Sequence, residues 1–307
     1  MATVLRIGTR GSRLALAQAA ELKRRLGEAF PELAAEGAVE IVKIRTSGDR
    51  LTGRPLAAEG GKGLFTKEIE DALKSGRVDL AVHSMKDMTA QIPGGLAIAC
   101  HLPRADARDA FISGKAPRLA DLPPGASLGT DSLRRKAQVL AARPDLVVVP
   151  LRGNVETRLK KLDKGEMDAI ILAAAGLARL GLATRATALM EPSEMLPAPA
   201  QGVIAVERRA HDKRTAGIAA ALDHAETAQC ATAERAFFAA LDGNCRTPLA
   251  ALAKVASGTL YLDAMIIKPD GSETHRARRE GAAEDAARMG EDAGAELKSR
   301  GGPGFFA

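Results

Sequence analysis

The sequence predicts an α/β protein built of two similar βα units, followed by a small α+β part. Short apolar runs of strand length alternate with amphipathic stretches up to about Ala220, a pattern typical of βαβ units around largely parallel sheets. A strand, Gly-Thr, Ser and a basic helix occur in that order at residues 8–18 and again at 129–138. From about Ala221 a helix, three strands and a final helix follow, which indicates a separate α+β part.

Composition restricts the class of protein. The chain has 307 residues, of which 46% are hydrophobic, enough for two or three domains with ordinary cores. A formal charge of +6 suits an anionic ligand or a nucleic acid. The aromatic content is only 3%, however, and single-strand binders usually stack bases on aromatic side chains, so we expect no nucleic-acid partner.

The cysteines and the apolar runs indicate the compartment. Cys100, Cys230 and Cys245 cannot all pair, and no two of them have metal-ligand spacing, so we expect a reducing compartment and no metal. No apolar stretch typical of a signal peptide is visible near the N-terminus, and the longest apolar run, 169–178, is too short to span a bilayer. These features favour a cytoplasmic protein without a membrane partner.

The first unit is expected over residues 1–102, with a return near 203–220. Its predicted strands lie at 4–8, 39–45, 80–82 and 96–100. Ser12 is suited to cap the helix after the first strand, where free N–H groups and Arg10 would attract an anion. Residues 46–63 are rich in glycine and follow no period, and connections of this length are usually functional or disordered. We predict a mobile flap there, carrying Arg50, Arg54 and Lys62.

The second unit is expected over residues 103–202. Its predicted strands lie near 111–112 and at 127–129, 146–149 and 168–172, and basic side chains follow several of them. A Gly-x-x-Asp marker precedes a strand in both units, at Gly76–Asp79 and Gly165–Asp168, which supports a diverged repeat. Residues 195–202 form a proline-rich crossing segment before a strand at 203–206. Two such units facing each other would form a cleft, a common place for a ligand.

The third part is expected over residues 221–307. A helix at 227–241, strands at 249–255, 259–267 and 273–278, a hairpin turn at Pro269–Gly271 and a helix at 282–298 are predicted. We expect residues 301–307 to fray. Cys245 lies on a Gly/Asn loop beside Arg246, which favours its thiolate. A nucleophilic cysteine would need an orienting histidine, and none is indicated by spacing.

Residues 79–89 place polar side chains directly after an apolar strand. Lys86 and Asp87 follow the run Leu80–Val82, and ligands of open α/β sheets bind at the carboxyl ends of strands. An exposed ion pair on a loop would look the same and contribute little. By themselves these residues leave both interpretations open.

Eight motifs in one unbroken order carry a family resemblance. They are VHSMKD, GKGLF, GT-x-SLRR, LRGN-x-x-TRL-x-KLD, AAGL-x-RLG, PA-x-QG, TAERAF and DGNCRTP. Together they resemble the porphobilinogen deaminase, or hydroxymethylbilane synthase, family over essentially the whole chain. The resemblance implies two periplasmic-binding-protein-like βα domains around a cleft, plus a small C-terminal α+β domain with a three-stranded antiparallel sheet.

The resemblance also implies an activity in porphyrin and heme biosynthesis. Members condense four porphobilinogen molecules head to tail on a covalent dipyrromethane cofactor, release ammonia each time and hydrolyse the product to linear hydroxymethylbilane. The cofactor would be joined by a thioether to Cys245. We further expect a transferase that acts as a monomer on this small-molecule substrate.

Site residues follow from the matching motifs. The substrate carries an acetate and a propionate, and guanidinium groups bind carboxylates in a fixed fork. Asp87 would stabilise the cationic azafulvene left by ammonia loss and move protons. Lys62 and Phe65 would cover the site. Cofactor or substrate binding is expected of Arg10, Ser12, Gln18, Lys86, Thr130, Ser132, Arg134, Arg135, Arg152, Gly153, Asn154, Arg158 and Arg179. We expect Ala at 134, 135 or 152 to damage turnover far more than the fold.

Three positions depart from the family pattern. Asp131 stands where Ser is usual, Arg13 where Pro is common, and Asn244 where Gly is more usual. A carboxylate at 131 would repel substrate unless it points away or caps the helix starting at Ser132. The main rival is a solute-binding protein of the same two-lobed architecture, which the loop cysteine and the absence of a visible signal peptide count against.

Overall fold

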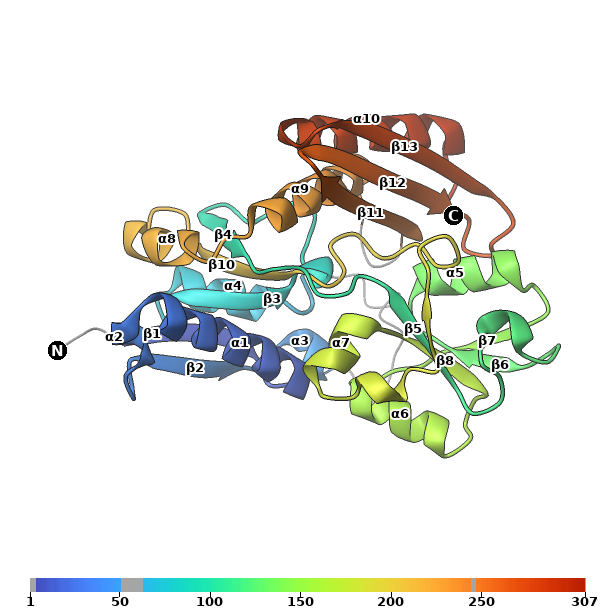
Figure 1. Cartoon of the computed structure of the whole chain (residues 1–307), viewed down its shortest axis with the longest axis horizontal. Coiled ribbons are helices and arrows are strands. Elements are labelled where there is room, and N and C mark those ends of the chain that lie inside the picture. The colour runs from blue at the N-terminus through green and yellow to red at the C-terminus, as the bar shows by residue number, and fades with distance from the viewer. Residues whose placement is uncertain (1–3, 51–62, 244–246, 307) are drawn as a thin grey trace. The chain divides into compact units, whose positions relative to one another are not determined.

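The computed structural model describes residues 4–50, 63–243 and 247–306 of the chain. The described residues form three sheets, two of five strands and one of three (Figure 1). Contacts divide the chain into two compact units. The first takes the described residues of Met1–Leu51, Gly61–Ala105 and Gly202–Ala228, and the second those of Asp106–Gln201 and Gln229–Ala307.

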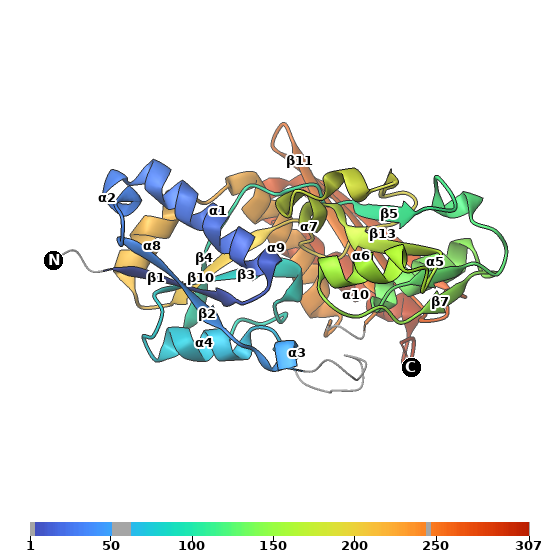
Figure 2. The same ribbon diagram turned by 90° about the horizontal axis from the view of Figure 1, so that it is seen from below.

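The first sheet has strand order β2-β1-β3-β10-β4 and is covered by helices on both faces. Leu22 and Leu26 of α1 pack on one face and Ile69 and Leu73 of α4 on the other, so α1 and α4 lie on opposite sides of the sheet (Figure 2). Its strands are β1 (Leu5–Arg10), β2 (Val39–Ile44), β3 (Leu80–Ser84), β4 (Leu96–His101) and β10 (Ile204–Arg209). Its helices are α1 (Arg13–Ala29), α2 (Pro31–Ala34), α3 (Ser47–Arg50), α4 (Lys67–Lys74) and α8 (Lys213–Ala220).

The second sheet repeats this topology with the order β7-β6-β8-β5-β9. In each sheet three parallel strands are followed by one antiparallel strand, β10 or β5, and then by an edge strand. The strands are β5 (Asp109–Ser113), β6 (Ser127–Gly129), β7 (Val147–Val149), β8 (Ala169–Ala173) and β9 (Ala188–Met190). Helices α5 (Leu133–Ala142), α6 (Val155–Asp163) and α7 (Ala174–Arg179) cover it. The predicted repeat is therefore confirmed.

The Gly-x-x-Asp marker forms the same turn and the same hydrogen bond to a neighbouring strand in both sheets. Gly76 and Gly165 adopt φ of 72° and 74°, which glycine tolerates and other residues rarely do. The aspartate three residues later accepts a hydrogen bond from the backbone of the neighbouring strand: Asp79 from Arg6 N at 2.9 Å, and Asp168 from Ser127 N at 2.7 Å. The marker thus precedes β3 or β8 and connects it by a hydrogen bond to its parallel neighbour, β1 or β6.

The C-terminal part is an antiparallel sheet, β11-β12-β13, packed on α9 and α10. Its elements are α9 (Ala225–Ala240), β11 (Leu249–Ala256), β12 (Thr259–Ile267), β13 (Thr274–Ala282) and α10 (Ala286–Gly301). The predicted hairpin turn is present, with Gly271 at φ 79° and its N–H bonded to Lys268 O at 2.8 Å. The predicted fold class is confirmed in its architecture: two α/β units of like topology and a small α+β part with a three-stranded antiparallel sheet.

Several local predictions were wrong. Strand β13 continues to Ala282, so α10 begins later than expected. The tail does not fray at its apolar end, because Phe305 is 6% exposed and packs into the C-terminal core. Strand β9 and helix α8 were not predicted, and the segment 46–63 begins with one helical turn, α3. The rest of that segment, including Arg54 and Lys62, lies outside the described residues. The cleft and the domain boundaries stay predictions.

Candidate active site

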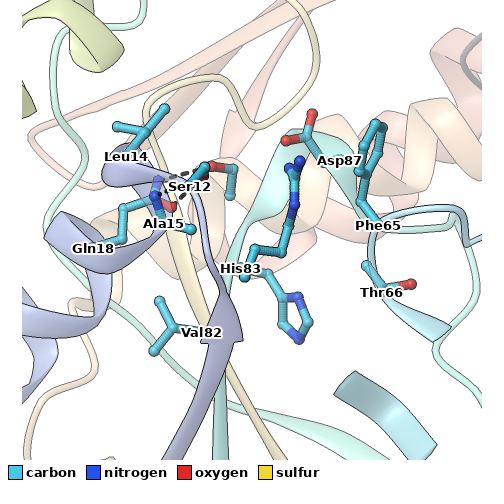
Figure 3. Close-up of a pocket in the computed structure, with 11 residues that line it drawn as sticks. Ser12, Leu14, Ala15, Gln18, Phe65, Thr66, Val82, His83 and Asp87 are labelled. Atoms are coloured by element: carbon cyan, nitrogen blue, oxygen red, sulfur yellow. Dashed lines mark hydrogen bonds between the residues drawn. The ribbon is translucent and has the colours of Figure 1, made fainter. Parts of the chain in front are cut away.

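A small pocket of about 60 Å³ lies at the carboxyl ends of β1 and β3. Figure 3 shows Ser12, Gln18, Phe65 and Asp87 around it, and Arg10 also contributes to its lining. Five of the predicted site residues therefore meet in one place. Arg10 and Ser12 come from the turn between β1 and α1, Gln18 from α1 itself, Asp87 from the turn after β3, and Phe65 from the residues before α4. Strand ends of this kind commonly hold the ligand site of an open α/β sheet.

Asp87 ends a short 3₁₀ turn, Met85–Asp87, that directly continues β3. The turn is fixed because Met85 N donates to Val203 O at 3.0 Å. Within the described residues Asp87 is exposed and makes no hydrogen bond or ion pair, so no Lys86–Asp87 pair of the kind we considered is present. A carboxylate held by a buried strand and left accessible in a pocket can act on a ligand.

Arg10 is held on two sides. Its Nε and Nη2 donate to Asp49 Oδ1 at 3.1 and 2.5 Å, and the guanidinium carbon lies 4.2 Å from the centre of the Phe65 ring. Asp49 Oδ2 in turn accepts from Thr46 N and Oγ1 at 3.2 and 2.8 Å. Burial raises the pKa of Asp49, but Arg10 and Thr46 outweigh it and the pKa is lowered. The ion pair and the cation–π contact fix the guanidinium at the pocket.

Two other predicted side chains of this unit have structural contacts. Ser12 caps α1 as expected, because its Oγ accepts from Ala15 N at 3.3 Å. Gln18 is 2% exposed and its Nε2 donates to Ser84 Oγ at 2.8 Å, so it ties α1 to the end of β3. Lys86 is half-buried in the turn beside Asp87.

The predicted arginines of α5 are buried around one carboxylate. Asp109, which is 0% exposed, accepts from Arg134 Nη2 at 2.7 Å through one oxygen and from Arg135 Nη2 at 2.7 Å through the other. Gln201 Nε2 donates to the same carboxylate at 2.9 Å. One further nitrogen of each guanidinium reaches a backbone oxygen: Arg134 Nη1 donates to Leu196 O and Arg135 Nη1 to Ile171 O. We therefore expect Ala at either arginine to damage the fold as well as turnover.

This cluster holds more positive than negative charge. Among the described residues, Asp109 is the single carboxylate ion-paired with either guanidinium. Burial raises the pKa of Asp109, yet both arginines together lower it well below its ordinary value. Burial lowers the pKa of Arg134, and Asp109 does not fully offset this. Arg134 Nε is moreover buried without a hydrogen-bond partner within the described chain.

Other predicted residues gather at the ends of β6 and β7. Asp131 does not cap α5, since Ser132 does so by accepting from Arg135 N. Asp131 instead accepts from Arg152 Nε at 3.0 Å, so its charge is paired with a predicted carboxylate binder. Thr130 Oγ1 accepts from Ser132 N at 3.2 Å. The remaining predicted residues are Gly153 (φ 113°), Asn154, which caps α6, Arg158, which bonds Gly153 O at 2.9 Å, and Arg179 at the end of α7.

The cysteines divide as expected where they are described. Cys100 is 1% exposed and burial raises its pKa to about 12, so its thiol is inert. Cys230 is buried in the C-terminal core. Cys245, with Asn244 and Arg246, lies outside the described residues.

A larger cavity of about 360 Å³ lies between α5 and strands β12 and β13, and none of the predicted site residues lines it. No cluster of metal-ligating side chains occurs within residues 4–50, 63–243 and 247–306. Over the same ranges no helix is long and apolar enough to cross a bilayer.

Sequence reasoning missed the carboxylates that hold the predicted arginines. Asp49 lies in the short helix α3, within a segment that shows no period in the sequence. Asp109 begins an apolar strand, where a buried acid is unusual. The one available signal was that Asp109 precedes the run Ala110–Ile112, so that a buried acid there would need a basic partner.

Two family models match the chain in consecutive segments. Residues 5–217 match "Porphobilinogen deaminase, dipyromethane cofactor binding domain", and residues 228–299 match "Porphobilinogen deaminase, C-terminal domain". Together they cover nearly all of the described structure, including the pocket and the buried arginine cluster.

Individual relatives match this chain over most of their length. The chain is 55% identical to the porphobilinogen deaminase of Paracoccus denitrificans, over 98% of this chain and 96% of that protein. It is 50% identical to the chloroplastic porphobilinogen deaminase of Oryza sativa subsp. japonica, over 99% of this chain and 86% of that protein. Among solved structures, an ABC-transporter periplasmic substrate-binding protein from Coxiella burnetii gives a TM-score of 0.45 at 15% identity, over 71% of this chain and 92% of that one.

Proposed function

The chain belongs to the porphobilinogen deaminase family, and we propose that it extends a dipyrromethane cofactor bound to Cys245 with porphobilinogen, using Asp87 as the catalytic carboxylate. The observation that carries the assignment of Asp87 is its position. It follows a buried strand into a pocket lined by Arg10, Ser12 and Phe65, and none of the described residues neutralises its charge.

The buried arginine cluster fits a carboxylate-bearing cofactor. Two guanidiniums share the Asp109 carboxylate, and the buried Arg134 Nε lacks a partner in the described chain. A buried excess of positive charge is costly unless an anion approaches it. We infer that Arg134 and Arg135 would hold acidic groups of the cofactor, while Asp109 keeps both guanidiniums in place. When bound, the cofactor would supply the nucleophilic pyrrole to which each new unit is joined.

Asp87 would act on charge and on protons. Loss of ammonia from porphobilinogen generates positive charge at the pyrrole, and a fixed carboxylate stabilises such charge best where water is excluded. The same oxygen can accept the proton that a pyrrole carbon loses as the new bond forms. Arg10, held by Asp49 and Phe65, would bind a carboxylate of the incoming substrate and orient it toward Asp87.

The finer assignments complete the proposal. We propose a transferase that works as a cytoplasmic monomer. Its formal charge of +6 suits anionic substrates. Lys62 and Phe65 would cover the site. Further acetate and propionate groups would be bound by Lys86, Thr130, Ser132, Arg152, Gly153, Asn154, Arg158 and Arg179.

Intact mass tests the covalent part of the proposal. Purified protein should be heavier than its sequence, and peptide mapping should place the added mass on the Cys245 peptide. Cys245→Ser should remove both the adduct and turnover, whereas Cys100→Ser should keep both because Cys100 is buried and inert. An active protein of unmodified mass would overturn the assignment of Cys245.

A further inference from the structure

The crossing segment, residues 195–202, is held by buried polar side chains from three elements. Gln138 of α5 bonds both polar groups of the Leu196 backbone, at 2.8 and 3.0 Å. Glu234 of α9 and Asp109 of β5, both 0% exposed, bond the next residues along the segment. Fully buried carboxylates are rare in proteins, because burying a charge is costly. Two of them in contact with one short segment therefore require an explanation.

Ala200 is the conformationally unusual member of this segment. Its φ is 59°, the left-handed region that a residue with a Cβ enters at a cost. Its N–H donates to Glu234 Oε2 at 2.5 Å, and the other oxygen, Oε1, accepts from Ala253 N of β11 at 2.7 Å. The charged acceptor therefore offsets the cost of the turn, because hydrogen bonds to ionised groups are the stronger ones.

Gln201 continues the connection to the arginine pair. Its Nε2 donates to Ala107 O at 2.7 Å and to Asp109 Oδ1 at 2.9 Å. The same Oδ1 accepts from Arg135 Nε and Nη2 at 3.2 and 2.7 Å. Gln201 directly follows the left-handed Ala200, and its side chain contacts the carboxylate that the two arginines share.

We propose that Glu234 is a positioning residue for carboxylate binding, acting through the Ala200 turn and Gln201 on Asp109 and its two arginines. This rests on the proposed function in one respect, that the arginine pair binds carboxylates of the cofactor or substrate. The hydrogen bonds and ion pairs of the two guanidiniums within the described residues do not include Glu234, and the crossing segment is the route by which we expect it to act on them. A side chain in the C-terminal part of the chain thereby sets the geometry of a site on the second sheet.

Replacing Glu234 by Met tests the proposal, because Met has a similar volume and accepts neither backbone bond. We expect the KM for porphobilinogen to rise about tenfold, the size of effect typical of losing a hydrogen bond to a charged group. We also expect a smaller share of the protein to carry the cofactor, as measured by intact mass. The matched control is Glu226→Met, the same change at an exposed position of the same helix, which should alter neither quantity.

A second substitution separates positioning from general support of the fold. Glycine adopts positive φ freely. Adding Ala200→Gly to the Glu234→Met variant should therefore return the KM and the cofactor content of the double variant most of the way to wild type. It cannot restore the bond to Ala253, so the melting temperature should recover less than the KM. No recovery of KM or cofactor content would mean that Glu234 acts only by holding β11, and would overturn the proposal.

Two more variants keep the test decisive if Glu234→Met does not fold. Gln201→Met cuts the link to Asp109 and should raise the KM by a similar factor, without rescue by Ala200→Gly. A wild-type KM and cofactor content in Gln201→Met would overturn the proposed route. Arg135→Lys addresses the proposed function separately: wild-type binding in that variant would count against the arginine pair itself, not against the route to it.

Discussion

The two five-stranded sheets share a topology but use their charged residues differently. On the first sheet, Asp87 and Arg10 lie at strand ends beside a pocket, and Asp87 has no ionic partner among the described residues. On the second sheet, Arg134 and Arg135 occupy the corresponding helix start but are 5% and 6% exposed around Asp109. These charged side chains are thus accessible at a pocket in the first unit and buried in the second.

This difference separates two roles of ionisable groups in one fold. A buried, hydrogen-bonded ion cluster is strongly destabilised when one partner is removed, because the other charge stays buried. An accessible carboxylate contributes little to stability, so its replacement should affect chemistry alone. Each half should therefore respond to a different measurement.

The largest expected effect is on stability, in the second half. Asp109→Asn keeps the shape but leaves two buried guanidiniums without their carboxylate, which should lower the free energy of unfolding by about 3–5 kcal/mol. Urea denaturation followed by circular dichroism measures it. Asp106→Asn, at a more exposed acid paired with Arg108, is the matched control and should cost at most about 1 kcal/mol. Equal effects of the two changes would remove the contrast between the halves.

Asp87→Asn should give the opposite result, in the first half. Its removal should slow ammonia release in a single turnover by about a hundredfold or more, since the neutral amide neither stabilises a cation nor accepts a proton. Stability should stay within about 1 kcal/mol of wild type, because the side chain is exposed. Rapid-quench assays on protein whose fold is confirmed by circular dichroism measure the rate. A rate within about threefold of wild type would exclude Asp87 as the catalytic carboxylate.

Arg10→Lys should produce an intermediate effect. Lysine cannot reproduce the two bonds to Asp49 or lie flat on Phe65, so we expect the KM for porphobilinogen to rise by about tenfold, with kcat reduced less. Steady-state kinetics measures both constants. Arg24→Lys, on the exposed face of α1, should leave both unchanged. A change in kcat alone would place Arg10 in the chemical step and not in binding.

The smallest effect concerns acid stability. An ion pair with Lys115 and bonds from Ser127 lower the pKa of Asp168 from 3.8 to about 2. Because the folded-state pKa is depressed, this stabilisation is present above about pH 4 and is lost as the pH falls toward 2. In acid titrations at low salt, the free energy of unfolding should therefore fall less for Asp168→Asn than for wild type over that pH window. An unchanged acid profile would show that the Asp168 carboxylate, with its bonds to Lys115 and Ser127, does not contribute to stability over that window.

The sequence by itself determined the order of the elements and the family. Strand and helix periodicity, the Ser12 cap and the two Gly-x-x-Asp markers are short-range patterns, readable because each depends on neighbours within a few residues. The eight motifs identified the family, and the resemblance assigned Asp87, Arg10 and Phe65 to the site. In the structure these three residues line one pocket, and their roles stay predictions. Local chemistry was sufficient for these conclusions.

Only the tertiary structure decided which groups neutralise one another. Asp109 meets Arg134 and Gln201 across 25 and 92 residues of chain, and Arg10 meets Asp49 across 39. Strand β10, far along the sequence, enters the first sheet between β3 and β4. Such contacts have no period and depend on how sheets and crossings bring distant segments together. The sequence therefore showed that these arginines were present, and the fold determined which are buried around a carboxylate and which face a pocket.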